Sequence, residues 1–487
     1  GGGYMLTVHE IQKFINEDKS SRKKFLASVG LRYYEADHDI KQFKAYYYNA
    51  DGDLVEDTQR SNIKIPHAFF TELVDQKTQY LLSGKEQFIK TDYPELQKEL
   101  DKYFDDDFKA ELSDLITYGS AEGFSYMYRY ADEDGMSRFA FADGIGIVEV
   151  PAKFASDKKD HVIYYYVDRI EKDKKVECIQ DWDDTQTYYY IKIDEQITKD
   201  ENQKINPRPH IVYEADENGN IEYDTFGTVP FFRFDNNKKQ FSDLKPIKEL
   251  IDDYDLMNCS LSNNLESPET IYFIRGMDGE NLDQFITNVK TKKALIAPID
   301  GDMDIKTVNI PYEARKIKMD LDETNIYRFG MGLNSTQVGD GNITNVVIKS
   351  RYSLLELKCN KAEIQLKKLL KKIIKVVIEE INKNNSWDYT LNDIYIDFER
   401  EILTNATDNA QIAQIEAATK QTEINTLLNL DTFIDRELIN QQIAEILDFE
   451  YEEIKEYFKD EESPEGEINA TEKALENMPT DEPKTEV

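Results

Sequence analysis

The sequence is poor in the residues that mark redox and metal chemistry. Among its 487 residues are three cysteines, Cys178, Cys259 and Cys359, which lie far apart and form no C-x-x-C spacing. Neither a zinc site nor a disulfide framework is therefore expected, and we interpret the cysteines as small core residues in a reducing cytoplasm. The five histidines show no ligand spacing and are expected to have single structural or surface roles. No metal or cofactor is predicted.

Motifs for catalysis are also missing. The sequence contains neither G-x-x-x-x-G-K-[ST] nor H-E-x-x-H. Residues 300–304 (DGDMD) begin like a calcium-binding loop, but Ile305 and Pro311 stand where that loop needs Gly and a bidentate Glu. We interpret this segment as an exposed acidic turn. Carboxylates are abundant, so an enzyme that cleaves carbohydrates with two of them is an alternative, but no pair stands out. The prediction is that the chain is not an enzyme.

Long apolar runs are absent. No stretch of 18 apolar residues and no signal peptide is visible, so no membrane segment is expected. Met5, which follows three glycines and Tyr4, is the expected translation start. Glycine and proline number only 21 and 13, which excludes fibrous classes. The 40% of hydrophobic residues, by contrast, are enough for a packed interior.

Basic residues are fewer than acidic ones, so the net charge is −36. Such a chain is not expected to bind DNA tightly, since tight binding requires many Lys or Arg contacts to phosphate. It could still form a conduit through which DNA slides, because sliding needs weak contacts. The simplest interpretation of the charge is a solvated surface that keeps the protein soluble.

The first half of the chain predicts helices followed by an antiparallel β region. A capping-box pattern at Thr7 and Glu10 opens a helix to about Lys19. An apolar stripe predicts a second helix, with Pro66 in its first turn and Gly84 at its close, and residues 94–121 are expected to be helical. Between residues 124 and 234, short Tyr-, Val- and Ile-rich runs alternate with turn signals, which is typical of hairpins.

The second half predicts two helices around a compact insert, then a loop and a long helix. Ser242 is expected to cap the first helix of the pair, and Pro311 opens the second, which ends at residues 330–332 (GMG). Two strands (270–274, 294–297) and a helix (282–289) are expected in the insert. Residues 333–344 form a polar loop. From residue 345 to about 382, apolar residues recur at steps of three and four, and they predict a helix roughly 55 Å long.

Four lysines on this long helix share one stripe: Lys361, Lys368, Lys372 and Lys375. They either face DNA or pair with acidic neighbouring elements or subunits, and the net charge favours the second interpretation. A short strand at about 394–398, two or three helices between about 407 and 460, and an acidic disordered tail at residues 461–487 complete the expected elements.

Two stretches carry a resemblance to a known family. The first spans residues 234–266 and includes FDNN, SDLKPI, LIDDYD and NNLE. The second spans residues 330–358 and includes GMG, GN and YSLLELK. Both are similar to the portal proteins of siphophages and related myophages of Gram-positive hosts, the family typified by the portal of phage SPP1. The order of elements matches over roughly residues 5–460.

The resemblance implies an α+β portal-type subunit. Residues 1–234 would form an α/β wing, 235–265 and 311–332 the two stem helices, and 266–310 a small mixed α/β clip. Residues 333–344 would be the tunnel loop at the channel constriction, 345–403 the long wing helix with a return strand, and 404–460 the helical crown. The tunnel-loop residues expected to meet DNA are Asn334, Ser335, Thr336, Gln337, Gly339, Asp340, Gly341, Asn342 and Thr344.

The same resemblance implies a function and partners. The chain would form a cyclic homo-oligomer, a dodecamer, at one capsid vertex of the virion, after assembly in the host cytoplasm. Double-stranded DNA would pass through it during packaging and ejection. The terminase large subunit, a head–tail connector, and the major capsid and scaffolding proteins would be its partners. Within the clip, Lys290, Lys292 and Lys293 are the candidate docking residues. Another structural head–tail or capsid component without catalysis is the alternative.

Overall fold

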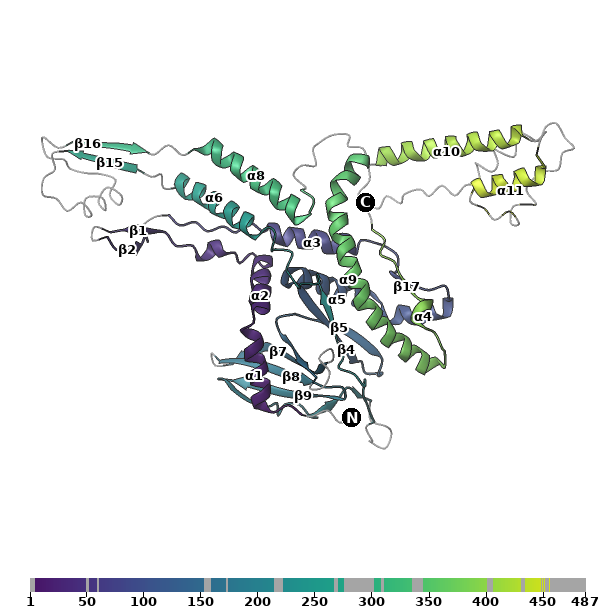
Figure 1. Cartoon of the computed structure of the whole chain (residues 1–487), viewed down its shortest axis with the longest axis horizontal. Coiled ribbons are helices and arrows are strands. Elements are labelled where there is room, and N and C mark those ends of the chain that lie inside the picture. The colour runs from purple at the N-terminus through teal and green to yellow at the C-terminus, as the bar shows by residue number, and fades with distance from the viewer. Residues whose placement is uncertain are drawn as a thin grey trace. The chain divides into compact units, whose positions relative to one another are not determined.

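The computed structural model describes residues 5–49, 52–58, 61–152, 159–171, 174–213, 222–266, 270–275, 302–307, 311–334, 345–400, 406–430 and 434–447, together with residues 449, 451 and 455. These residues form a mixed fold of helices and strands, as the α+β class requires (Figure 1). Two compact units divide the chain: one holds residues 1–340 and 350–402, and the other holds residues 341–349 and 403–487.

The larger unit begins with five helices, α1 (Val8–Lys19), α2 (Arg22–Tyr34), α3 (Phe69–Leu81), α4 (Pro94–Tyr103) and α5 (Asp106–Glu122), and a 3-10 turn at Asp39–Gln42. The predicted capping box is confirmed, because the Thr7 hydroxyl accepts from the Glu10 amide at 3.2 Å and Glu10 accepts from the Thr7 amide at 2.9 Å. The predicted ends of α3 were wrong. That helix starts at Phe69, beyond Pro66, and its C-cap is Leu82 rather than Gly84.

The β region is antiparallel throughout, as predicted. β14 (Phe231–Asp235), β4 (Phe124–Ala131) and β5 (Ser137–Ala142) pair in that order. A larger sheet has the order β10 (Gln196–Lys199), β9 (Gln186–Ile193), β8 (Lys174–Trp182), β7 (Lys159–Glu171) and β6 (Ile147–Pro151), with β11 (Arg208–Pro209) beside β9. A short pair, β12 (Ile211–Val212) and β13 (Tyr223–Asp224), lies next to it in sequence.

The long helix is α9, and it spans Asn345–Asn385. Its predicted apolar stripe is buried from Leu355 to Ile381, and it packs against residues of α3, α4, α5 and β5 in the largest hydrophobic core. After α9 comes a 3-10 turn (Leu391–Asp393), and β17 (Tyr395–Ile396) then returns to pair with β3 (Ile89–Lys90). One face of the long helix is therefore held by the larger unit.

Two helices and a strand pair occupy the region that precedes α9. α6 (Lys248–Glu266) and α8 (Tyr312–Gly330) pack together, and β15 (Thr270–Arg275) pairs with β16 (Asp302–Thr307) (Figure 1). The strand predicted at 270–274 is confirmed. The acidic turn predicted at 300–304 was wrong, because residues 302–304 belong to β16 and pair with residues 273–275. The insert helix and strand expected at 282–289 and 294–297 lie outside the described residues.

The start expected for the first helix of this pair was also wrong. α6 begins at Lys248, and residue 235 ends strand β14. Ser242 does not cap α6: its hydroxyl accepts from the Leu244 amide at 3.0 Å, inside a run of turns. Those turns are held by tertiary contacts, such as the Asp243 amide donating to the Ser120 carbonyl at 3.0 Å.

The smaller unit contains α10 (Ala406–Asn429) and α11 (Arg436–Ile446), which pack through Ile424, Ile439 and Ile443. The acidic tail predicted at 461–487 lies outside the described residues. Over the described part of the chain, none of the helices is both long enough and apolar enough to cross a membrane.

One element pair was not predicted. β1 (Tyr46–Tyr48) and β2 (Leu54–Glu56) form a small antiparallel hairpin that projects from the larger unit (Figure 1). Every residue of the two strands is exposed.

Candidate functional site

The helix pair α6–α8 packs together within the larger unit. The helices run antiparallel, since Gly330 at the end of α8 lies against Ile247 just before α6, whereas Arg315 near the start of α8 reaches Ser260 at 3.4 Å. Lys318 pairs with both Asp253 and Asp322, which ties the two helices together. The inner sides of the helices therefore hold each other by polar contacts as well as by packing.

The outer side of α8 carries two exposed aliphatic side chains among charged and polar ones. Ile317 and Leu321 are 64% and 54% exposed. Successive residues of a helix are about 100° apart, so Ile317 lies roughly opposite Ile326, which is buried in the core. Two large aliphatic side chains thus point away from α6 and meet nothing within the described residues that buries them.

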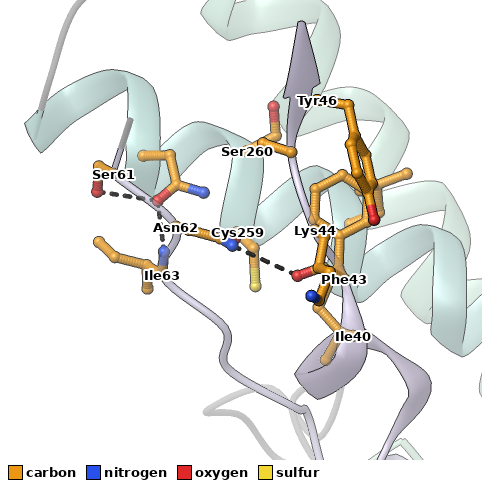
Figure 2. Close-up of a pocket in the computed structure, with 12 residues that line it drawn as sticks. Ile40, Phe43, Lys44, Tyr46, Ser61, Asn62, Ile63, Cys259 and Ser260 are labelled. Atoms are coloured by element: carbon orange, nitrogen blue, oxygen red, sulfur yellow. Dashed lines mark hydrogen bonds between the residues drawn. The ribbon is translucent and has the colours of Figure 1, made fainter. Parts of the chain in front are cut away.

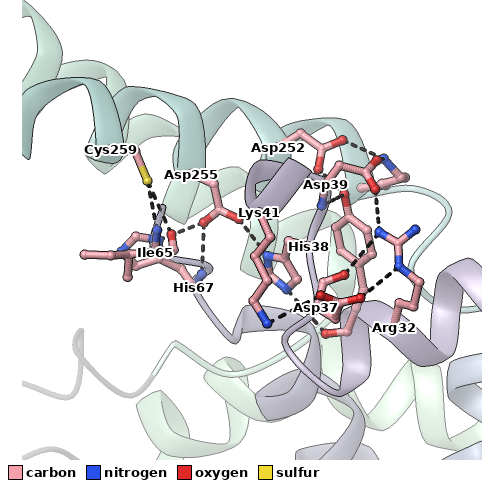
Figure 3. A network of polar contacts seen from close by, with 12 residues as sticks. Arg32, Asp37, His38, Asp39, Lys41, Ile65, His67, Asp252, Asp255 and Cys259 are labelled. Atoms are coloured by element: carbon pink, nitrogen blue, oxygen red, sulfur yellow. Dashed lines mark hydrogen bonds and ion pairs between the residues drawn. The ribbon is translucent and has the colours of Figure 1, made fainter. Parts of the chain in front are cut away.

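A buried carboxylate anchors α6 to the preceding segments (Figure 3). Asp255 is fully buried; one of its oxygens lies 2.6 Å from Nδ1 of His38, and the other lies 2.7 Å from Nδ1 of His67. The His67 amide donates to that second oxygen at 2.9 Å. Burial by itself would raise the pKa of Asp255, but the hydrogen bonds from His38 and His67 outweigh it and lower the pKa below its usual value.

Beside this anchor lies a small cavity of about 220 Å³, between α6 and the chain that carries the hairpin (Figure 2). The Asn263 side chain on α6 accepts from the Ile63 amide at 2.6 Å and from the Ser61 hydroxyl at 3.1 Å. The Ile65 amide donates to the Cys259 sulfur at 3.2 Å. Residues 61–65 are therefore fastened along α6.

A second polar cluster joins the helix pair to the long helix. The buried Lys77 of α3 donates to Asp243 at 2.9 Å and to Asn236 at 2.7 Å. The buried Lys358 of α9 lies 3.4 Å from the same carboxylate and donates to the Gly330 carbonyl at 2.9 Å. Burial would raise the pKa of Asp243, but the two ammonium groups lower it well below its usual range.

Comparison with known proteins decides what kind of subunit carries these features. The family model of phage portal proteins, SPP1 Gp6-like, matches residues 12–464. The chain belongs to this phage portal family. The predicted family and the predicted portal function are thereby confirmed. Portal proteins are structural components of the phage particle, which is consistent with the prediction that the chain is not an enzyme.

Two portal proteins illustrate the relationship. The portal protein of Bacillus phage SPP1 is 27% identical over 385 residues, which cover 78% of this chain and 74% of the relative. The portal protein of Clostridium phage phiCD119 is 26% identical over 405 residues, covering 77% and 85%. A solved structure of the neck of an empty GTA particle, computed with C6 symmetry, aligns with a TM-score of 0.36 and 9% identity, over 78% of this chain and 90% of that one.

Most of the predicted portal site residues fall outside the described residues. Of the tunnel-loop set, Asn334 is described, and its side-chain amide donates to Glu323 at 3.2 Å. The start of the loop is held by Gln76, which exchanges two hydrogen bonds with the backbone of Leu333, at 2.8 and 2.9 Å. The rest of that set and the clip lysines Lys290, Lys292 and Lys293 lie outside the described residues.

The lysine stripe of α9 is exposed. Lys375 lies 3.9 Å from Glu379 one turn along the same helix, and Lys368 contacts Gln365 at 3.4 Å. No ion pair from the stripe to another element appears within the described part of this subunit. Pairing with a neighbouring subunit stays a prediction.

His38 and His67 are 29 positions apart, and no pattern in the sequence indicated that they share one carboxylate. Among the described residues, no group of three or more His, Cys, Asp or Glu side chains is arranged to hold a metal ion. Two of the three cysteines, Cys259 and Cys359, are buried, as expected for core residues, while Cys178 is half-buried. Burial raises the pKa of Cys359 to about 11, so its thiol stays protonated at neutral pH.

Proposed function

We propose that copies of this portal chain close into a ring, twelve in number, with the α6–α8 pairs side by side around a central DNA channel. The observation that carries the proposal is the outward apolar face of α8 at Ile317 and Leu321. A two-helix hairpin cannot cover both of its sides by itself. Packing against the next copy in the ring removes the exposed aliphatic surface from water, which is favourable by roughly 25 cal/mol per Å².

In this ring, residues 1–234 would act as the wing, α6 and α8 as the stem, residues 266–310 as the clip and residues 404–460 as the crown. Residues 333–344 would line the constriction. The net charge of −36 suits a conduit, because DNA in such a channel is not held by dense phosphate pairing. The ring would sit at one capsid vertex of the virion and serve packaging, head–tail joining and ejection.

The partners of the ring follow from the same assignment. The terminase large subunit and later the head–tail connector would dock at the clip, with Lys290, Lys292 and Lys293 as contacts. Capsid and scaffolding proteins would surround it during assembly in the host cytoplasm. The chain would need no cofactor and catalyse no reaction, since the terminase would supply the packaging energy.

The ring is tested by native mass spectrometry of the purified protein. Twelve subunits of 56.8 kDa give 12 × 56.8, about 680 kDa. The double variant Ile317→Lys, Leu321→Lys should yield folded monomers, because each interface would then have to bury two ammonium groups. Val167→Lys changes an apolar side chain of β7 that is 52% exposed, and should leave the ring intact. A wild-type protein that stays monomeric at micromolar concentration would overturn the proposal.

A further inference from the structure

The hairpin β1–β2 presents a second uncovered apolar surface. We define the arm as residues 43–49, 52–58 and 61–66. Its exposed large apolar side chains are Phe43, Tyr46, Tyr47, Tyr48, Leu54, Val55 and Ile65. Tyr48, the most exposed of them, is 74% exposed. A ribbon with three residues in each strand is marginally stable in water by itself. Within the described residues neither face of this ribbon is covered, which indicates that another molecule covers it.

The arm and α8 are attached to different sides of α6. The arm is fastened at Cys259 and Asn263, whereas α8 is fastened at Asp253. At about 100° per residue, Cys259 and Asn263 lie roughly 120° and 80° around the helix from Asp253. In Figure 1 the hairpin and α8 accordingly flank α6 on two sides. One subunit thus carries two separate apolar surfaces, one on each flank of its stem helix.

We propose that the arm of one subunit packs on the outward face of α8 of a second copy of this chain. The inference rests on the proposed ring and names one of its contacts. A ring closed by rotation joins subunits head to tail, so every copy must present two different and complementary surfaces. The arm and the Ile317–Leu321 face are such a pair, and each occurs once per chain. An unrelated partner on the arm would leave the α8 face uncovered.

The chemistry of the two surfaces matches. In the hairpin Tyr48 pairs with Leu54, and Tyr47 pairs with Val55, so each face of the ribbon offers an aromatic ring beside an aliphatic side chain. These groups suit the aliphatic Ile317 and Leu321. Aromatic side chains with a polar tip are favoured in such contacts because they bury a large area while the hydroxyl stays hydrated.

The contact is tested by photo-crosslinking within assembled protein. p-Benzoylphenylalanine is placed at position 47 of the full chain, and ¹⁵N-labelled and unlabelled subunits are mixed before assembly. After irradiation, mass spectrometry should find peptides from the arm joined to peptides from residues 312–330, with unlike labels on the two halves. The matched control carries the same group at Tyr223, which is 52% exposed in β13 and should not crosslink to α8.

A second variant measures the contribution of the arm to assembly. Tyr47→Ser, Tyr48→Ser and Leu54→Ser together should raise the protein concentration needed for half-assembly by about tenfold or more, since each removes partly buried apolar area from every interface. Crosslinks to α8 with like labels only would overturn the inference, because the arm would then contact its own subunit. Normal rings without arm-to-α8 crosslinks would also overturn the inference, but they would not contradict the proposed ring. Absence of rings would overturn the proposed function itself.

Discussion

Asp255 offers the sharpest test of how helix α6 is anchored. Replacement by Ala removes the acceptor of three hydrogen bonds at once, from the two imidazoles of His38 and His67 and from the His67 amide. Two of the three residues, Asp255 and His38, are fully buried. The shortened side chain leaves buried donors without their acceptor.

The size of the effect follows from those contacts. A hydrogen bond to a charged group contributes about 1.5–3 kcal/mol, and a buried donor left without an acceptor costs about 1–3 kcal/mol. His67 is partly exposed, so its share is weakened by solvent. We therefore expect a local loss of about 3 kcal/mol in Asp255→Ala. Because 1.4 kcal/mol is tenfold in an equilibrium, opening of this region should increase about a hundredfold.

Native-state hydrogen exchange measures this opening directly. The His67 amide, which donates to Asp255, should exchange about a hundredfold faster in Asp255→Ala than in the wild type. Glu249→Ala is the matched control, because Glu249 is an exposed carboxylate of the same helix and should shift exchange little. If the two variants exchange alike at His67, the carboxylate does not anchor α6 and the reasoning fails.

The same anchor has a defined pH dependence. The pKa of Asp255 is lowered in the folded chain, since the hydrogen bonds from His38 and His67 outweigh the effect of burial. A carboxyl with a lowered pKa contributes stability that is fully present above its unfolded value, about 3.9, and that is lost as the pH falls through the folded value. Protection of the His67 amide should therefore fall below about pH 4 in the wild type and be already lost in Asp255→Ala at neutral pH.

Two further predictions concern segments outside the described residues. Reversing Lys290, Lys292 and Lys293 to Glu should weaken binding of purified terminase, measured by pull-down, and leave the ring mass unchanged; equal binding would contradict the clip assignment. The double variant Gly339→Pro, Gly341→Pro should form normal rings but package or retain less DNA, because proline removes backbone freedom that the tunnel loop would need. The assay is nuclease-protected DNA after packaging in vitro, and unchanged protection with normal rings would refute that role.

Regular periodicity made the long elements predictable. The capping box of α1 and the apolar stripe of α9 are local patterns, and local patterns are read directly from the sequence. The start of α6 was missed because it is set by tertiary contacts. The Asp243 carboxylate accepts from Lys77, and the Asp243 amide donates to the Ser120 carbonyl. These contacts keep the residues just before Lys248 in turns. An N-cap pattern at Ser242 cannot reveal partners more than a hundred residues away.

Short and exposed elements were missed for a different reason. Helix α2 is capped by Ser21 but buries few apolar residues, so its stripe is weak. The hairpin β1–β2 has no buried face, hence no apolar alternation to recognise. In residues 302–304 the acidic side chains suggested a turn, yet the backbone pairs with β15 regardless of them. The anchor formed by His38, His67 and Asp255 was missed because the fold brings together side chains that are far apart in the sequence.

The cluster at Asp243 joins the two helices that flank the proposed tunnel loop at residues 333–344. Lys358 of α9 donates to the last carbonyl of α8, at Gly330, and pairs with Asp243, which also pairs with Lys77 of α3. The helices on both sides of the loop are therefore tied to one carboxylate in the body of the subunit. Gln76 then clamps Leu333 by two backbone hydrogen bonds. Movement of α8 relative to α9 would have to break the Lys358 contacts, because they join the end of α8 to α9 and to Asp243.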